Sequence, residues 1–189
     1  DQIKWLKNDL QYVSTDKLLI ICTHIPVRNQ SSISRYQDLY SAIAPYHEVH
    51  IMSGHTHYHQ NMLIENNGIY EHVHGAACGA WWTSAINSDG TPNGYGVYEV
   101  EGNRIANWHY KSTNYDKSFQ IRMYPVYSFN DNSTNIIANI WNSDNQWKVE
   151  LFEDGIKTGD MVRFTSYEKA AYQFFKSLGK AEPAGLDEA

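Results

Sequence analysis

The sequence predicts an α+β fold in which an α/β portion with helices is followed by a small antiparallel β domain. Two continuous apolar runs, at residues 17–26 and 48–57, read as strands and follow segments with helical apolar spacing. The later part of the chain instead has short strand-like runs separated by turn sequences such as "SDGTPNG" and "EDG". We therefore expect two domains, residues 1–115 and 116–189. The polar C-terminal tail closes no element, so the second domain is expected to be incomplete.

The individual elements follow from periodicity. Helices are expected over 2–13 and 31–46, and the run "KLLIICTHIP" is expected to be a strand buried on both faces. A hairpin is predicted at 93–111. Further strands are predicted at 119–126, 135–142, 147–157 and 160–165, packed as a small sandwich, before a helix at 166–180 that stops at Gly179.

Composition excludes several classes of partner. The net charge is −6 and Lys and Arg do not cluster, so no nucleic-acid-binding surface is expected. No apolar stretch approaches the length of a membrane span. Cys22 and Cys78 lie in apolar runs and are expected to be small buried residues. The chain opens without a Met, which suggests that it begins inside a larger protein.

The segment "SGHTHYHQN", residues 53–61, places His55, His57 and His59 at alternate positions after Gly54. If the segment is extended, the three imidazoles share one face and could converge on a metal ion. Gly54 would let the backbone turn tightly. His24 follows the other buried strand, and ligands gather at the carboxyl ends of strands in open α/β sheets. Exposed histidines on a surface strand are the alternative.

An isolated His after one strand, followed about thirty residues later by Gly-His-x-His after another, resembles the C-terminal half of a calcineurin-like metallophosphoesterase. The resemblance implies a two-layer β sandwich flanked by helices, with a dinuclear metal site at the strand ends. It implies that His24 and His55 bind one divalent ion and that His57 binds the other. It further implies a hydrolase that cleaves phosphate esters by attack of a metal-bound hydroxide, using two Mn, Fe or Zn ions.

The likeness extends to the C-terminal side. Residues 78–112, the run "QIRMY" and residues 136–155 resemble a bacterial secreted subgroup of this family that carries a C-terminal β domain. This subgroup resemblance implies a periplasmic or secreted protein. It leaves the substrate, the oligomeric state and the identity of the metals open.

The chain departs from the family pattern because Asp-x-His and Gly-Asn-His-Asp/Glu do not occur in it, and its one Gly-Asp, at 159–160, lies after the histidines instead of before them. The bridging aspartate and the remaining ligands would come from an N-terminal remainder of the catalytic domain. We therefore expect the isolated chain to be inactive and to hold no metal or only part of the complement.

Other polar residues have weaker interpretations. His59 and Arg28 are candidates for substrate contact, the latter because guanidinium groups match phosphate oxygens. His72 and His74 are expected to be same-face histidines of a strand without a metal role. Trp81 and Trp82 are expected to pack in a core or between domains rather than to line a substrate. The remaining histidines, His47, His50 and His109, are expected to be structural or exposed.

Two alternatives to the phosphoesterase remain open at this stage. The β-rich region could be a ligand-binding or interaction module, for example for glycans, in which the histidines are vestigial. Alternatively, the histidines could form a mononuclear structural metal site, with His59 as the first candidate for a fourth ligand. Motifs upstream of Asp1 and the metal stoichiometry of the chain discriminate among these hypotheses.

Overall fold

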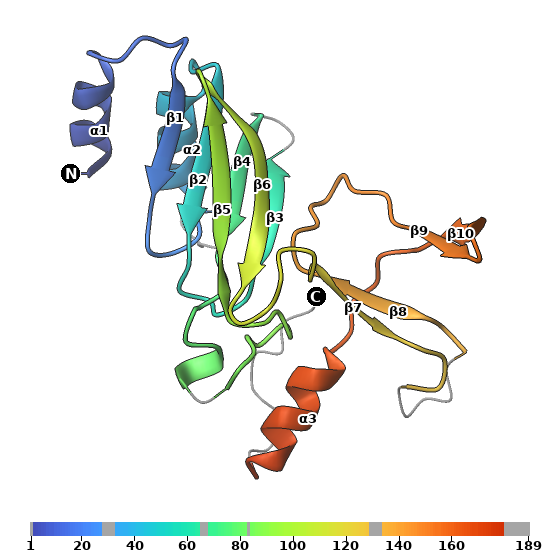
Figure 1. The fold of residues 1–189 in the computed structure, drawn as a ribbon. Coiled ribbons are helices and arrows are strands. Elements are labelled where there is room, and N and C mark those ends of the chain that lie inside the picture. Colours follow the sequence, from blue (N-terminus) through green and yellow to red (C-terminus); the bar gives the residue numbers. More distant parts are fainter. Residues whose placement is uncertain (1, 28–32, 65–67, 83, 129–133, 180–189) are drawn as a thin grey trace.

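The computed structural model describes residues 2–27, 33–64, 68–82, 84–128 and 134–179 (Figure 1). The N-terminal elements are α1 (Gln2–Leu10), β1 (Leu18–Cys22), α2 (Ile33–Ile43), β2 (Glu48–Ser53), β3 (Gln60–Ile64) and β4 (Ile69–Val73). The later elements are η1 (Ala80–Trp82), β5 (Gly94–Glu101), β6 (Arg104–Ser112), β7 (Ile121–Tyr124), β8 (Ile137–Ile140), β9 (Glu150–Glu153), β10 (Ile156–Asp160) and α3 (Lys169–Ser177). This mixture agrees with the predicted α+β class.

A four-stranded sheet with the order β1-β2-β4-β3 forms the N-terminal portion. β1, β2 and β4 run parallel, and β3 returns antiparallel to β4. The carboxyl ends of the three parallel strands therefore meet at one edge of the sheet. The loops after β1 and β2 carry His24 and His55, so both predicted loops lie at that edge.

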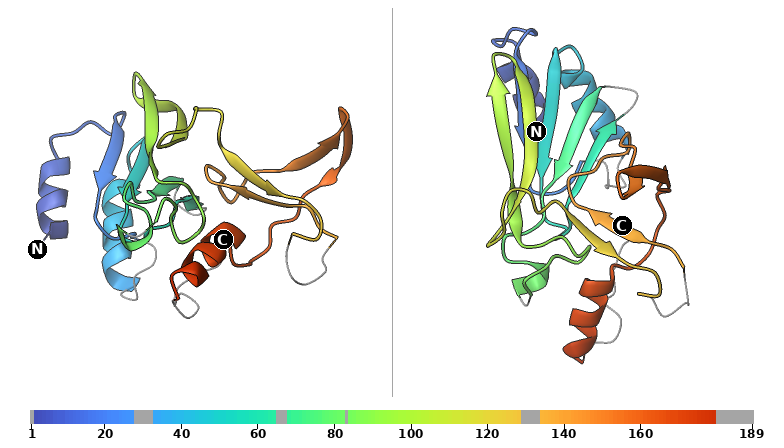
Figure 2. Two further views of the ribbon diagram at one scale, coloured as in Figure 1. Left: turned by 60° about the horizontal axis from the view of Figure 1, so that its bottom comes forward. Right: turned by 45° about the vertical axis from the view of Figure 1, so that its right-hand side comes forward.

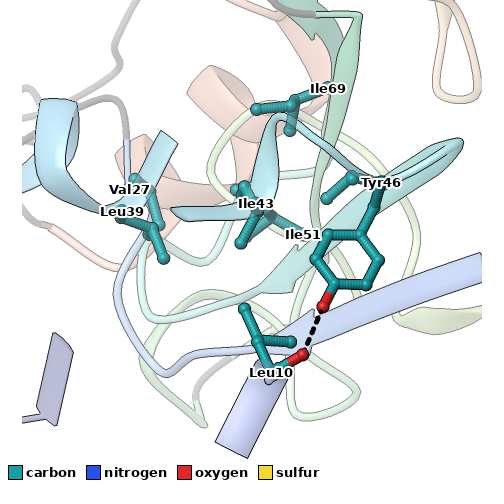
Figure 3. Packing of buried hydrophobic residues seen from close by; sticks show 8 residues of the cluster. Leu10, Val27, Leu39, Ile43, Tyr46, Ile51 and Ile69 are labelled. Carbon is teal, nitrogen blue, oxygen red and sulfur yellow. Dashed lines mark hydrogen bonds between the residues drawn. The ribbon is translucent and has the colours of Figure 1, made fainter. Parts of the chain in front are cut away.

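One face of this sheet packs against the helices in an apolar core (Figure 3). Ile51 and Ile69 are fully buried there against Ile43 of α2. α1 is joined to the core through Leu10, whose carbonyl accepts a hydrogen bond of 2.9 Å from the Tyr46 hydroxyl. Each fully buried aliphatic side chain contributes about 1.5–3 kcal/mol, so this core is the main source of stability of the N-terminal portion.

The opposite face of the sheet lies beneath the β5–β6 hairpin (Figure 1). Here the buried side chains are imidazoles and aromatic rings. His50 and His72 stack with ring centroids 5.1 Å apart, and Trp108 of β6 meets His72 edge-on at 5.4 Å. The Glu48 carboxylate accepts a hydrogen bond of 2.7 Å from the Ile105 backbone N–H and so ties the hairpin to β2. The two layers are thus joined by polar and aromatic contacts.

The prediction that the first strand is buried on both faces is wrong. Ile20 is 40% exposed and Cys22 is exposed, because β1 lies at the edge of the sheet and pairs only with β2 among the described strands. Cys78 is partly buried, so neither cysteine is the fully buried residue that was expected, and both are free thiols.

In the C-terminal part, the hairpin of β5 and β6, the strands β7 and β8 and the helix α3 occur where they were predicted. Gly179 follows α3 with a φ of +66°, as expected for a helix stop. The described residues do not form the predicted sandwich: β7–β8 and β9–β10 are two separate two-stranded ribbons. Residues 147–157 turn at Gly155 instead of forming one strand, and 161–165 are not a strand.

Tyr110 anchors β6 to the loop that precedes β5 and provides a test of this packing. Its side chain is fully buried, burial raises its pKa, and its hydroxyl donates a hydrogen bond of 2.7 Å to the Pro92 carbonyl. Tyr110→Phe is expected to lower the free energy of unfolding by about 1 kcal/mol, because the Pro92 carbonyl loses the shorter of its two hydrogen bonds and keeps only the 3.4 Å bond from Asn87 Nδ2. Urea denaturation measures this, with the 54%-exposed Tyr95→Phe as control. Equal stabilities of the two variants would contradict it.

Candidate metal site

The loops that follow β1, β2 and β4 are joined to one another by backbone hydrogen bonds. The Gly54 N–H donates to the His24 carbonyl at 3.1 Å, and the His74 N–H donates to the Ser53 carbonyl at 2.8 Å. These bonds continue the parallel ladder beyond the last strand residues. They hold the residues of the candidate site on a common backbone frame.

His24 and His55 are brought together as the sequence predicted. Their nitrogens His24 Nε2 and His55 Nδ1 lie 3.0 Å apart, and the ring centroids are separated by 4.8 Å. Two neighbouring ligand nitrogens at about 2.1 Å from one octahedral ion lie about 3.0 Å apart. Both side chains are exposed. The pair therefore fits two adjacent positions on a single ion.

The segment 54–59 is not the extended strand that was expected. β2 ends at Ser53, and His55 and His57 adopt left-handed backbone conformations with φ of +72° and +58°. Each such conformation costs a non-glycine residue roughly 1 kcal/mol or more. Gly54 does not adopt one. Since strain at alternate histidines is maintained by surrounding contacts, it marks this loop as a candidate functional segment.

The ring of His57 is oriented by the segment after β4 and not by the loop that carries His24. Its Nδ1 donates a hydrogen bond of 2.8 Å to the Gly79 carbonyl, which can only accept. The neutral ring then carries its lone pair on Nε2. A ring N–H fixed by a backbone carbonyl, with the other nitrogen able to bind a metal, is the usual arrangement of histidine ligands.

The three predicted ligands do not form one cluster. Within the described ranges of the chain, no group of three or more His, Cys, Asp or Glu could hold a metal ion. His24 and His55 form a pair, and His57 is held separately at Gly79. The described residues therefore bring two of the three predicted ligands together and hold the third apart from them.

The side chain of His59 points into the protein, toward Tyr110 of β6. It is 8% exposed, its ring centroid is 4.4 Å from that of Tyr110, and burial lowers its pKa to about 3. Its proposed contact with substrate stays a prediction, as does the role of Arg28, which lies outside the described residues.

Glu71 was not singled out in the sequence, although it supports the His24 loop. Its carboxylate is fully buried and accepts a hydrogen bond of 2.6 Å from the Val27 backbone N–H. A single acid between the apolar residues Ile69 and Val73, on the core face of a strand, was the signal that could have identified it.

Glu71→Met is expected to lower the free energy of unfolding by about 1–3 kcal/mol, because the Val27 N–H loses its acceptor. Chemical denaturation of the variant beside Glu101→Met, at a position where the side chain is 70% exposed, measures the effect. Equal stability of the two variants would show that Glu71 does not anchor this loop.

The loop 88–94, interpreted in the sequence as a turn, contacts the candidate site directly. The Ser88 N–H and hydroxyl both donate to the His57 carbonyl, at 3.0 and 2.9 Å. The Asp89 carboxylate accepts from the His59 N–H at 2.9 Å, and burial raises its pKa to about 6. The sequence "SDG" indicates only a turn. The hydrogen-bond partners of Ser88 and Asp89, His57 and His59, lie about thirty residues earlier, so the local sequence does not reveal these contacts.

Trp82 does not pack in a core, contrary to expectation. It is 83% exposed with a φ of +62°, and it lines an open pocket with Ala77 and Cys78. This pocket adjoins Gly79, whose carbonyl accepts the His57 N–H. The side chain of Trp81 lies outside the described part.

Comparison with known proteins defines the class of the chain. Residues 71–185 match the family described as the C terminal of calcineurin-like phosphoesterase. The matched range covers more than half of the chain, so the protein belongs to this family. The range starts after the loops that carry His24, His55 and His57. No curated protein and no solved structure matches the chain, and none of its described helices is long and apolar enough to cross a membrane.

Proposed function

We propose that the protein hydrolyses phosphate esters at a centre of two divalent ions, with His24 and His55 as ligands of one ion and His57 as a ligand of the other. The observation that carries the proposal is the 3.0 Å approach of two histidine nitrogens from loops 31 residues apart, in a member of a phosphoesterase family. Mn, Fe and Zn all accept imidazole nitrogen.

The ions would supply Lewis acidity and an activated nucleophile. The residues of this chain orient the histidine ligands and set the distances between them. The carbonyl of Gly79 keeps the His57 proton on Nδ1, and the Gly54–His24 backbone bond sets the distance between the two loops. Glu71 limits movement of the loop that follows His24 through its bond to Val27.

We further propose that residues 1–189 alone do not turn over substrate. A dinuclear centre needs carboxylates that bridge the ions, and the described residues near the histidines form only a pair plus one separate ring. The remaining ligands would come from an N-terminal part of the catalytic domain. A bacterial, periplasmic or secreted location is proposed from the sequence resemblance alone.

The test compares residues 1–189 with the natural coding sequence extended upstream. Both are assayed with p-nitrophenyl phosphate and bis-p-nitrophenyl phosphate after loading with Mn²⁺. We expect hydrolysis by the extended protein, loss of hydrolysis in His55→Ala, and none by residues 1–189. Equal activity of the extended protein and its His55→Ala variant would overturn the assignment of this residue.

A further inference from the structure

The carboxylate of Glu168 is a buried junction between α3 and the β7–β8 ribbon. Glu168 caps α3 by accepting a hydrogen bond of 2.7 Å from the Ala171 N–H. It also accepts from Arg122 Nη1 at 3.0 Å and from the Tyr124 hydroxyl. The residue is only 6% exposed. A buried carboxylate with three donors fixes its neighbours relative to one another.

This junction also holds the backbone of the loop 88–94. Arg122 Nη1 donates to the Gly90 carbonyl at 2.7 Å, and Asn139 Nδ2 donates to the Asp89 carbonyl at 2.7 Å. Gly90 has a φ of +78°, and a Cβ placed on it would lie 2.2 Å from the Glu168 carboxyl carbon. Only glycine permits this approach, so the loop rests directly on Glu168.

The same loop reaches the candidate metal site at its other end. Ser88, two residues before Gly90, donates twice to the His57 carbonyl. The path from Glu168 to His57 therefore consists of Arg122, the backbone of 88–90 and the two Ser88 bonds.

A second contact leads from α3 to the ring of His57. Ala171 and Phe175 of α3 pack against the buried Ala80 of η1. Ala80 directly follows Gly79, the residue whose carbonyl accepts the His57 Nδ1–H. Figure 2 shows α3 next to the loops that follow β4. The backbone and the ring of His57 are thus both supported by segments that α3 covers.

We infer that Arg122 and Glu168 are positioning residues for His57, so that the C-terminal segment 116–179 sets the geometry of the metal site. The inference concerns the conformation of His57, and its consequence for metal binding rests on the proposed function. Neither residue touches the site. Both act through the loop 88–90.

The test uses the double variant Arg122→Met/Glu168→Gln in the full-length protein, which leaves no buried charge without its partner. The matched control is Arg104→Met/Glu101→Gln, an ion pair exposed at 63% and 70%. Imidazole ¹⁵N chemical shifts report the tautomer and environment of His57, and calorimetric titration with Mn²⁺ reports the affinity. We expect shifted His57 signals, unchanged His72 signals, and an affinity for Mn²⁺ lower by about tenfold.

Unchanged His57 signals in the folded double variant would overturn the inference, and loss of thermal stability alone would not support it. If the double variant does not fold, Gly90→Ala decides, because its added Cβ displaces the loop while both charges remain. Shifted His57 signals in Gly90→Ala would support the positioning of His57 by the loop 88–90, and unchanged signals would reject it. If the wild-type protein binds no Mn²⁺ while the His57 signals still move, the proposed function fails and the positioning role stands.

Discussion

Acidification below pH 6.5 is expected to destabilise the protein steeply, because neutral imidazoles are buried between the sheet and the β5–β6 hairpin. His72 is fully buried, and burial, followed by the neighbouring His50, lowers its pKa to about 2. Burial also lowers the pKa of His50 and His74. Protonating any of these rings in place would put a cation in a layer of aromatic contacts.

The sign of this pH dependence follows from the number of protons that the folded and the unfolded protein bind. An unfolded histidine binds its proton below about pH 6.5, whereas His72 in the folded protein stays neutral until far lower pH. The stability that these neutral histidines contribute is therefore fully present above pH 6.5. It falls as the pH decreases, by about 1.4 kcal/mol per pH unit for each proton that the unfolded protein binds and the folded protein does not. Asp89 opposes this between about pH 6 and 4, since its raised pKa lets the folded state bind the extra proton.

His59 and His72 each contribute about one proton to the slope, because burial lowers their pKa values to about 3 and about 2, and Asp89 offsets one of these protons below about pH 6. The expected net loss is therefore roughly 1.4–2.8 kcal/mol per pH unit. His50 and His74 act in the same direction, and Glu48, 3.0 Å from His50 Nε2, reduces the contribution of His50.

Urea denaturation at pH 8, 7, 6 and 5.5 measures the slope. His72→Gln is expected to reduce the slope by about one proton, whereas the exposed His47→Gln leaves it unchanged. A flat profile from pH 8 to 5.5 would contradict the burial argument.

Much of the fold could be predicted from the sequence because its signals are local. The apolar spacing of 2–13 predicts a helix and the pattern of 93–111 predicts a hairpin, and the structure has the helix at Gln2–Leu10 and the hairpin at 94–112. Burial could not be predicted in the same way. Cys22 and Ile20 lie in an apolar run, but their exposure depends on which strands pair with β1, and this is a tertiary property.

The same distinction applies to the candidate site. The meeting of His24 and His55 follows from a general rule about parallel strand ends. The left-handed conformation of His57 was missed because contacts from Gly79 and Ser88 accompany it, and nothing in the Gly-His-x-His segment indicates those partners. The role of Gly90 was also missed, because a glycine in "SDG" looks like a turn residue whether or not a carboxylate lies against it.

Removal of His55 is expected to lower the affinity of the full-length protein for Mn²⁺ by about 100-fold or more, since loss of a residue that only supports a ligand already costs 10–100-fold. His55→Gly is the sharper variant. It removes one nitrogen of the 3.0 Å pair and at the same time relieves a left-handed conformation that glycine adopts freely. We therefore expect metal binding to be lost while the metal-free protein keeps its stability or gains about 1 kcal/mol.

Loss of metal binding together with unchanged stability of the metal-free protein would show that His55 is a metal ligand and not a residue that only stabilises the fold. If the His24–His55 contact served mainly to join two loops, His55→Gly would destabilise the metal-free protein, because both the ring contact and the hydrogen bond disappear. If the strained backbone is retained for metal binding, the variant is at least as stable without metal and no longer gains stability when Mn²⁺ is added. Thermal unfolding with and without Mn²⁺, beside the exposed His47→Gly, distinguishes the two cases, and destabilisation of the metal-free variant would favour the structural role.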